Sequence, residues 1–378
     1  MRGIGETGLK VCVVGPIHPF RGGIAQHATI MCRKLSERHD VKAVTFKRLY
    51  PSILFPGKTQ FDTSKKGVSF DAERLIDSLN PLTWTLAGRR IGAESPDLVI
   101  VEWWSPFFGP CMASVLSNAR PKRSLFICHN VLPHESHSLA KPLTITALRK
   151  GDAFVVHAEE EAQTLRRILP GRTVERTILP EVGVFPKTGM GKEEARARLG
   201  IQGRTILFFG LVRKYKGLMD LIKAMGLLRN EKITCLVTGE FYDKKEPYMA
   251  EIDRLKVGNC IRIVDDYVPS EDVETYFAAA DLVVLPYRSA TQSGVVQVAC
   301  TFQRPVIATK VGGLPEAVDD GRTGILVTPD DPGALARAIR RFYSESLEGR
   351  FTAAIRADEG RFSWDRVIEV IETIGASH

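Results

Sequence analysis

Two short segments in the second half of the chain carry residue types that suit the binding of an anion. The first is GLVRKYKG, residues 210–217, which follows the apolar run at residues 205–209 and precedes a helical pattern. Its Arg213 offers a planar fork and its Lys216 a point charge, and both groups suit phosphate. Gly210 permits a tight turn where the apolar run ends. We call residues 210–217 the basic loop and predict that it holds a phosphate, although a solvated surface loop would have the same composition.

The second segment has no charged residue and lies where a helix begins. It follows the apolar run at residues 282–285, and its glycine opens a helical pattern. A helix N-terminus carries unpaired N–H groups and about half a positive charge, and glycine admits an anion close to them. We predict that this segment and the basic loop form two halves of a diphosphate site; an ordinary serine cap is the alternative for this segment alone. We call it the uncharged turn, and it consists of Thr291, Gln292, Ser293, Gly294 and Val295.

The pattern around these segments alternates apolar runs with helical stretches. The runs are continuous rather than alternating, which indicates strands of parallel sheets that are covered on both faces. Strands are therefore predicted at residues 11–14, 41–46, 98–101, 125–128, 153–157, 205–209, 234–238, 261–264, 281–286 and 305–308.

The alternation stops in a stretch that contains proline and glycine, near residues 180–190, and then restarts. We therefore predict an α/β protein with two doubly wound, Rossmann-like domains, at residues 1–185 and 186–359. A last helix, at residues 360–378, is expected to pack back on the first domain. Because parallel sheets bind ligands beyond the carboxyl ends of their strands, the basic loop and the uncharged turn should face a cleft between the domains.

Composition and charge narrow the class of protein. The chain has 378 residues, of which 44% are hydrophobic and 25% charged, as in soluble globular proteins. No window offers the roughly 20 apolar residues that a membrane span requires, and the first residues lack the apolar core of a signal peptide. A cytoplasmic location is therefore expected. The net charge of +8 fits an anionic partner, but the basic clusters are short and lack aromatic neighbours, which argues against nucleic acid.

Several motifs of other protein classes do not occur in the sequence. The seven cysteines form no CxxC pair and no Cys–His cluster with metal-ligand spacing, which indicates reduced thiols. Neither a GxxxxGK[ST] motif nor a GxGxxG motif after a strand is present. Nucleoside triphosphate hydrolysis and dinucleotide binding therefore lose support.

The second half of the chain contains a series of motifs over about residues 205–341. They are FFGLVRKYKGLMDLIKAM, LVTGEFYD, VDDYVPSEDVETYFAAADLVVLPYRSATQSG and RPVIATKVGGLPEAVDDGRTGILVTPDDPGALARAI. In this order they resemble the second domain of the retaining GT-B glycosyltransferases of the group 1 family. The first domain is similar to that family more loosely, through VVGPIHPFRGGIAQHA, DLVIVEWW, FICHN and DAFVVHAEEE.

The resemblance implies a GT-B fold and an EC 2.4 transferase of polysaccharide biosynthesis. It implies that a sugar moves, with retention of configuration, from a nucleotide-diphosphate donor to a glycan, lipid-linked or small-molecule acceptor. The donor is a co-substrate, and neither a cofactor nor a metal is expected. Two alternatives stay open: a non-catalytic nucleotide-sugar-binding protein, and a GT-B-shaped nucleotide-sugar epimerase, which would need carboxylates in the cleft.

The resemblance also assigns the donor-binding residues. The family's basic pair falls on Arg213 and Lys216, which would hold the donor diphosphate and stabilise the charge that develops as it leaves. Because the family more often has its arginine directly after the glycine, Arg213 must reach from two positions later. The loop that contains Tyr267 and Val268 would line the nucleobase, and the uncharged turn would contact phosphate and the transferred sugar.

Two features of the first domain and one departure complete the predicted site. Gly22 and Gly23 match the family's glycine loop, which closes over the donor phosphates. His129 matches a histidine at a strand end that faces the cleft, and it is our third candidate catalytic residue. The family usually carries a Glu-x7-Glu pair whose positions are Ala290 and Val298 in this chain, so the carboxylates expected there are missing.

The acceptor side has the least specific signal. Residues 46–58 and residues 102–110 each follow a predicted strand and carry aromatic side chains, with basic ones in the first segment. Loops at strand ends should line the acceptor half of the cleft. Such a rim suits a lipid-linked sugar, and we therefore expect peripheral association with the inner face of a membrane. Packing of the aromatic residues within the domain is the alternative.

Overall fold

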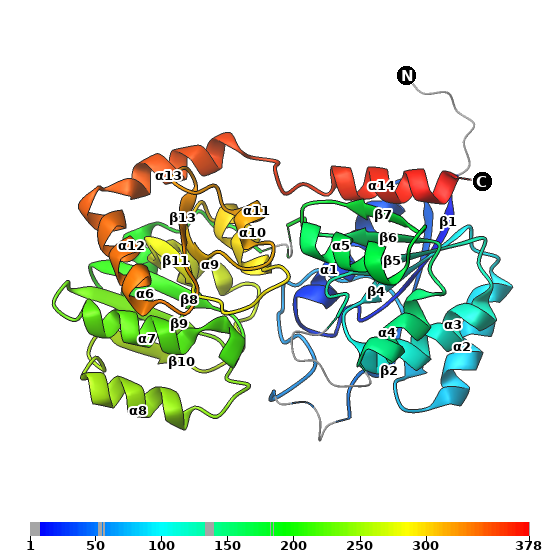
Figure 1. Ribbon diagram of the computed structural model, residues 1–378, viewed down its shortest axis with the longest axis horizontal. Coiled ribbons are helices and arrows are strands. Elements are labelled where there is room, and N and C mark those ends of the chain that lie inside the picture. The colour runs from blue at the N-terminus through cyan, green and yellow to red at the C-terminus, as the bar shows by residue number, and fades with distance from the viewer. Residues whose placement is uncertain are drawn as a thin grey trace.

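The computed structural model describes residues 8–51, 55, 57–132, 140–181, 183 and 185–377. Two parallel β-sheets, each flanked by helices, lie at the two ends of an elongated molecule (Figure 1). Every sheet has an apolar cluster on each of its faces, which is why its central strands read as continuous apolar runs. The predicted α/β class with two doubly wound domains is confirmed.

The first domain is built on a seven-stranded sheet in the order β3-β2-β1-β4-β5-β6-β7. All of its paired strands run parallel, with helices as the crossovers. Its elements are β1 (Lys10–Val14), α1 (Gly23–Ser36), β2 (Asp40–Arg48), β3 (Glu73–Asp77), α2 (Pro81–Ala93), β4 (Leu98–Trp103), the 3-10 helix η2 (Pro106–Phe108), α3 (Gly109–Ala119), β5 (Arg123–Cys128), α4 (Ala140–Leu148), β6 (Ala153–Val156), α5 (Glu159–Ile168) and β7 (Thr173–Arg176).

The second domain is built on a six-stranded parallel sheet in the order β10-β9-β8-β11-β12-β13. The basic loop follows β8, and the uncharged turn lies between β11 and α10. Its elements are α6 (Lys192–Leu199), β8 (Arg204–Phe209), the 3-10 helix η3 (Lys214–Lys216), α7 (Leu218–Leu227), β9 (Ile233–Thr238), α8 (Glu246–Leu255), β10 (Ile261–Val264), α9 (Val273–Ala279), β11 (Leu282–Leu285), α10 (Gly294–Thr301), β12 (Val306–Thr309), α11 (Leu314–Ala317), β13 (Gly324–Val327), α12 (Pro332–Ser344) and α13 (Leu347–Ala357).

Three edge strands were not among the predicted ones. They are β3, β7 and β13, and β3 and β7 in particular expose several of their residues. An edge strand has a neighbour on one side only and needs less apolar sequence than a central strand. The central strands were predicted because both of their faces are covered.

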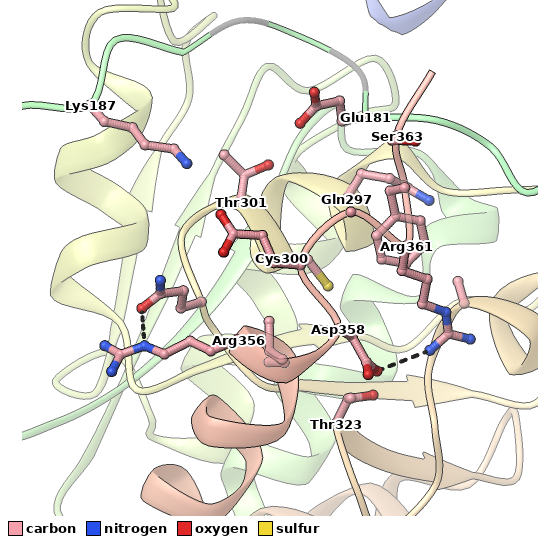
Figure 2. A pocket seen from close by; sticks show the side chains of 16 residues that line it. Glu181, Lys187, Gln297, Cys300, Thr301, Thr323, Arg356, Asp358, Arg361 and Ser363 are labelled. Carbon is pink, nitrogen blue, oxygen red and sulfur yellow. Dashed lines mark hydrogen bonds and ion pairs between the residues drawn. The ribbon is translucent and has the colours of Figure 1, made fainter. Parts of the chain in front are cut away.

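The chain crosses between the two sheets twice, at residues 177–191 and 358–364, and the two crossings lie side by side. The backbone N–H of Glu181 donates to the carbonyl oxygen of Phe362 at 2.8 Å, and the Trp364 indole donates to the Glu181 carbonyl oxygen at 3.1 Å. Figure 2 shows Glu181 next to Ser363 at the rim of a cavity of about 280 Å³, which we call the crossing cavity.

The last helix, α14 (Asp365–Ala376), lies along the first domain after the second crossing (Figure 1). Its Val367 and Ile371 belong to one apolar cluster with Val13 and Met31 of the first domain. The fold of the first domain thus includes the C-terminal end of the chain.

Candidate functional site

Two adjoining cavities lie between the domains. The smaller has a volume of about 280 Å³ and the larger of about 790 Å³. Both are lined by residues from the first domain and from the strand ends of the second, as expected for parallel sheets that face each other. They share five lining residues, which are Gly23, Leu211, Tyr215, Gln292 and Gly294.

The structure brings the predicted site residues together at these two cavities. Most of them line the smaller cavity: Gly22, Gly23, Gly210, Lys216, Tyr267, Val268, Gln292, Ser293, Gly294 and Val295. The remaining three, Thr291, Arg213 and His129, line the larger cavity. Val298, which occupies the position of the second glutamate of the missing Glu-x7-Glu pair, also lines the smaller cavity.

Arg213 and Lys216 lie in different cavities, although one diphosphate was expected to contact both. The exposed guanidinium of Arg213 lies over the Tyr242 ring, 5.0 Å from its centre. Aromatic stacking is a common environment for arginine, and here it holds the side chain away from the smaller cavity. In this structure the Arg213 side chain therefore faces the larger cavity.

Lys216 lies at the end of η3, where the basic loop turns toward α7. Gly217, the next residue, has a φ of 68°, and a Cβ atom there would lie 1.8 Å from the carbonyl oxygen of Pro286, so only glycine allows this turn. The Lys216 ammonium is 5.5 Å from the centre of the Tyr287 ring and has no carboxylate partner among the described residues. Burial lowers the pKa of Lys216. A partly buried ammonium without a counter-ion among the described residues is suited to the binding of an anion.

The uncharged turn does not cap its own helix. The Ser293 hydroxyl lies 3.2 Å from the Tyr287 hydroxyl and makes no bond to the N–H groups at the start of α10. The alternative of an ordinary serine cap is therefore wrong. The N–H groups of the first turn of α10 lie at the wall of the smaller cavity, the same cavity that Lys216 lines. A negatively charged group there would meet both the helix dipole and an ammonium.

The other two side chains of the uncharged turn contact the first domain. The Thr291 hydroxyl donates to the Asn130 side-chain oxygen, and the Gln292 amide donates to the His157 carbonyl oxygen. These bonds place the turn against the ends of β5 and β6. The geometry of the site therefore depends on both domains.

A loop of the first domain, residues 57–66, covers the predicted nucleobase loop. The Lys58 ammonium is 3.1 Å from the Asp266 carboxylate, and the Tyr267 hydroxyl donates to Asp62 at 3.1 Å. The loop follows β2, so it reaches across the cleft to the strand end after β10. The smaller cavity is thus closed by contacts between the two domains on this side.

Arg21 and Glu240 form a buried ion pair at the smaller cavity that the sequence did not reveal. Glu240 follows β9, is 3% exposed and accepts a hydrogen bond from Arg21 of the first domain. The Arg21 guanidinium also lies 5.0 Å from the centre of the Tyr267 ring. Glu240 was visible in the motif LVTGEFYD, but its partner is 219 residues away, and only the fold joins them. This carboxylate lies in the cavity from which the Glu-x7-Glu pair is missing.

His129 makes a close contact with a buried carboxylate. Its Nε2 is 2.5 Å from Oε2 of Glu102, and Oε1 of Glu102 is 2.9 Å from Nδ1 of His27. In the described part of the chain these three residues are the one group whose ligand atoms lie close enough for a metal ion, within 4.8 Å of one another. Because both carboxylate oxygens are at hydrogen-bonding distance from a ring nitrogen, the arrangement is that of two hydrogen-bonded pairs.

The larger cavity has an aromatic wall from the segment 102–110. Trp104 and Phe107 line it, whereas Trp103 is fully buried in the core of the first domain. The Trp104 indole donates to the Tyr50 hydroxyl at 2.8 Å, which ties this segment to the loop after β2. Packing within the domain is thus confirmed for Trp103, whereas Trp104 lies at the wall of the larger cavity.

The crossing cavity is distinct from the two cavities of the cleft. It is lined by the end of α10, through Gln297, Cys300 and Thr301, and by both crossings of the chain (Figure 2). The Gln297 amide donates to the Leu179 carbonyl oxygen at 3.2 Å. The helix that faces the smaller cavity with its N-terminus is thereby attached to the first crossing.

We expect the stability of the protein to depend on the ionisation of Glu161. This carboxyl, at the start of α5, is 9% exposed and accepts a bond from the Val131 N–H, and burial raises its pKa to about 7. The folded state then binds more protons than the unfolded state between about pH 5 and 7, so the free energy of unfolding falls as the pH rises. For the unchanged protein, we expect the free energy of unfolding in urea to fall by on the order of 2 kcal/mol across this range. The variant Glu161→Gln should not show this fall. The exposed Glu160→Gln is the control, and parallel pH curves for Glu161→Gln and the unchanged protein would contradict the assignment.

Residues 203–345 match the family model described as "Glycosyl transferases group 1". The second domain of this chain belongs to that family. Among curated relatives of this chain, a D-inositol 3-phosphate glycosyltransferase of Streptomyces avermitilis is 30% identical over 239 residues, which are 60% of this chain and 49% of that protein. The protein of the same name from Thermobifida fusca is 26% identical over 384 aligned positions, 92% of this chain and 87% of that protein. The first of these matches thus spans about half the length of the relative.

Solved structures match nearly the whole chain at low sequence identity. A sucrose-phosphate synthase from Thermosynechococcus elongatus has a TM-score of 0.73 and 17% identity and covers 96% of this chain and 97% of that one. Anabaena Alr3699/HepE in complex with UDP has a TM-score of 0.75 and 17% identity and covers 98% and 100%. These likenesses show the fold, which is GT-B. None of the described helices is both long and apolar enough to cross a bilayer.

Proposed function

We propose that this protein is a glycosyltransferase that uses a nucleotide-diphosphate sugar. The donor is held in the smaller cavity, and the acceptor enters the larger one. The observation that carries the proposal is the pairing of Lys216, an ammonium without a carboxylate partner in the described chain, with the uncapped N-terminus of α10 at one cavity. Anabaena HepE, which has the same fold, was solved with UDP and with UDP-glucose, so UDP is the first nucleotide to test.

The reaction that fits this geometry is the departure of a nucleoside diphosphate. As the bond between sugar and phosphate breaks, negative charge grows on the diphosphate. Lys216 and the N–H groups of α10 stabilise that charge more in the transition state than in the ground state, which lowers the barrier. In a reaction with retention, the acceptor hydroxyl attacks from the side of the leaving group, and the leaving phosphate takes its proton. In the proposal Lys216 and the helix, rather than a metal ion, supply the positive charge.

The acceptor half of the proposal rests on the larger cavity. Its aromatic wall suits the face of a sugar ring, and Arg213 suits an acceptor that carries an anionic group. The first domain also exposes Leu82 and Leu86 of α2, at 74% and 63% exposure, which suits contact with a membrane that carries a lipid-linked acceptor. We propose a glycan or a lipid-linked sugar as the acceptor, at the cytoplasmic face of the membrane.

Thermal-shift measurements with UDP, GDP, ADP and their sugars are the first test of the proposal. We expect one nucleoside diphosphate to raise the melting temperature, because it binds the folded state alone. Incubation with the corresponding radiolabelled nucleotide sugar should then release the nucleotide and transfer or hydrolyse the sugar. Formation of an epimer would support the epimerase alternative, and binding without any turnover would support the non-catalytic one.

A further inference from the structure

Glu102 lies in the interior of the first domain, where an ionised carboxylate is stable only if other groups compensate its charge. It is fully buried at the end of β4, next to the end of β1. A Cβ atom at Gly15, just after β1, would lie 2.8 Å from the Cβ of Glu102, so glycine at this position makes room for the side chain. Burial of a charge is costly unless hydrogen bonds compensate it. Among the described residues, the two groups that compensate this charge are histidine rings, one from α1 and one just after β5.

His27 is held as a neutral ring that donates to Glu102. Its Nε2 is buried and has no hydrogen-bond partner among the described residues, so a proton on that nitrogen would be unpaired. Burial lowers the pKa of His27, in agreement with a neutral ring. The single proton therefore lies on Nδ1 and points at Oε1 of Glu102. For Glu102 itself, burial raises the pKa, but the contacts with the two histidines lower it more, so that the pKa lies below its usual range.

His129 must also donate to Glu102. An ionised carboxylate only accepts hydrogen bonds, so the Nε2 of His129 carries a proton. In the neutral ring, Nδ1 is then an acceptor. That nitrogen has no partner among the described residues and is not enclosed, and His129 lines the larger cavity with its side chain 11% exposed. The carboxylate thus decides which nitrogen of His129 is free at the cleft.

We propose that Glu102 is a positioning residue that fixes His129 in the Nε2–H tautomer, so that Nδ1 accepts a hydrogen bond from a sugar hydroxyl in the larger cavity. The inference rests on the proposed function for the identity of the ligand, but the tautomer itself is a property of the protein alone. The hydroxyl belongs to the transferred sugar or to the acceptor. His27 is the second support of the same carboxylate, and its ring packs 4.7 Å from that of Trp364 at the start of α14.

Long-range ¹H–¹⁵N correlation spectra of histidine-labelled protein test the tautomer directly. At pH 8 we expect His129 to be protonated on Nε2 and His27 on Nδ1, with the signals assigned from His129→Gln and His27→Gln. In Glu102→Gln, the His129 signals should move toward a mixture of tautomers, because an amide can both donate and accept. A wild-type His129 that is protonated on Nδ1, or that already shows a mixture, would overturn the proposal.

Kinetics of the same variant test the positioning role. With the donor that turns over in the nucleotide-sugar panel, Glu102→Gln should lower kcat at least about tenfold while the Kd for the nucleoside diphosphate changes less than about twofold. Glu102→Asp should keep part of the activity, because it keeps the charge. Slower donor hydrolysis without acceptor would place the hydroxyl on the transferred sugar, whereas slower transfer alone would place it on the acceptor.

Glu161→Gln is the matched control, since it removes a second buried carboxylate of the first domain, whose hydrogen bond among the described residues is to the backbone of Val131. We expect its kcat to remain close to that of the unchanged protein. An equal fall of kcat in both variants would show a general loss of order near His129 and would overturn the specific role. If no nucleotide sugar turns over, the proposed function fails, and the spectra still decide the tautomer.

Discussion

Lys216→Ala is expected to lower kcat/KM for the nucleotide sugar by at least about 100-fold, or about 2.7 kcal/mol in the barrier. The reason is that Lys216 is the ammonium at the cavity that the α10 N-terminus faces, and no described carboxylate neutralises it. Affinity for the nucleoside diphosphate should fall as well, since the same charge meets the bound phosphates. Steady-state kinetics and calorimetric titration measure the two effects.

Lys214→Ala is the matched control for this variant. Lys214 starts the same 3-10 turn, is exposed and does not line the smaller cavity. We expect it to change kcat/KM less than about threefold, as surface charges away from a site contribute little. Equal effects of the two substitutions would mean that the basic loop acts only through its net charge, and the assignment of Lys216 to the phosphates would then be wrong.

Gly312→Ala is expected to disrupt the uncharged turn and to lower the free energy of unfolding by about 3 kcal/mol or more. Gly312 has a φ of 49°, and a Cβ atom there would lie 1.6 Å from the carbonyl oxygen of Ala290. The next residue, Gly313, donates its N–H to the Thr291 carbonyl oxygen at 2.9 Å. A displaced backbone at Gly312 therefore displaces the turn that bonds to Asn130 and His157. Urea unfolding measures the stability, and titration with the nucleoside diphosphate measures the site.

Gly321→Ala is the control that measures the cost of the backbone conformation without a steric clash. Gly321 also has a positive φ, of 77°, but a Cβ atom there would meet nothing within 4 Å. Its substitution should cost only the left-handed conformation, about 1–2 kcal/mol, and leave nucleotide binding unchanged. A similar loss for both variants, with binding intact in both, would show that the uncharged turn does not depend on Gly312.

The sequence allowed the fold and the strand-end location of the site to be predicted. Continuous apolar runs such as Val283–Leu285 reveal central parallel strands, because both of their faces are covered by helices. The carboxyl ends of those strands then place the basic loop and the uncharged turn in one cleft. Three of the four edge strands were missed because polar residues are tolerated there, and β7 is a clear case.

The contacts inside the site could not be predicted, since they join residues from distant elements. The predicted strand ends at residue 101, but β4 continues to Trp103 and places the Glu102 carboxylate between two histidines. The fold alone brings Arg21 and Glu240 together across the cleft. The Arg213 side chain points toward Tyr242 because of side-chain packing, which cannot be predicted from the spacing of residues along the chain.

A crystal structure of the protein with the nucleoside diphosphate that gives the largest thermal shift tests the central claim most directly. The account predicts that the two phosphates lie within hydrogen-bonding distance of the Lys216 ammonium and of the N–H groups of Gly294 and Val295. It also predicts that the base lies against the loop at Tyr267 and Val268. A nucleotide bound outside the smaller cavity, or phosphates that contact neither Lys216 nor the start of α10, would contradict it.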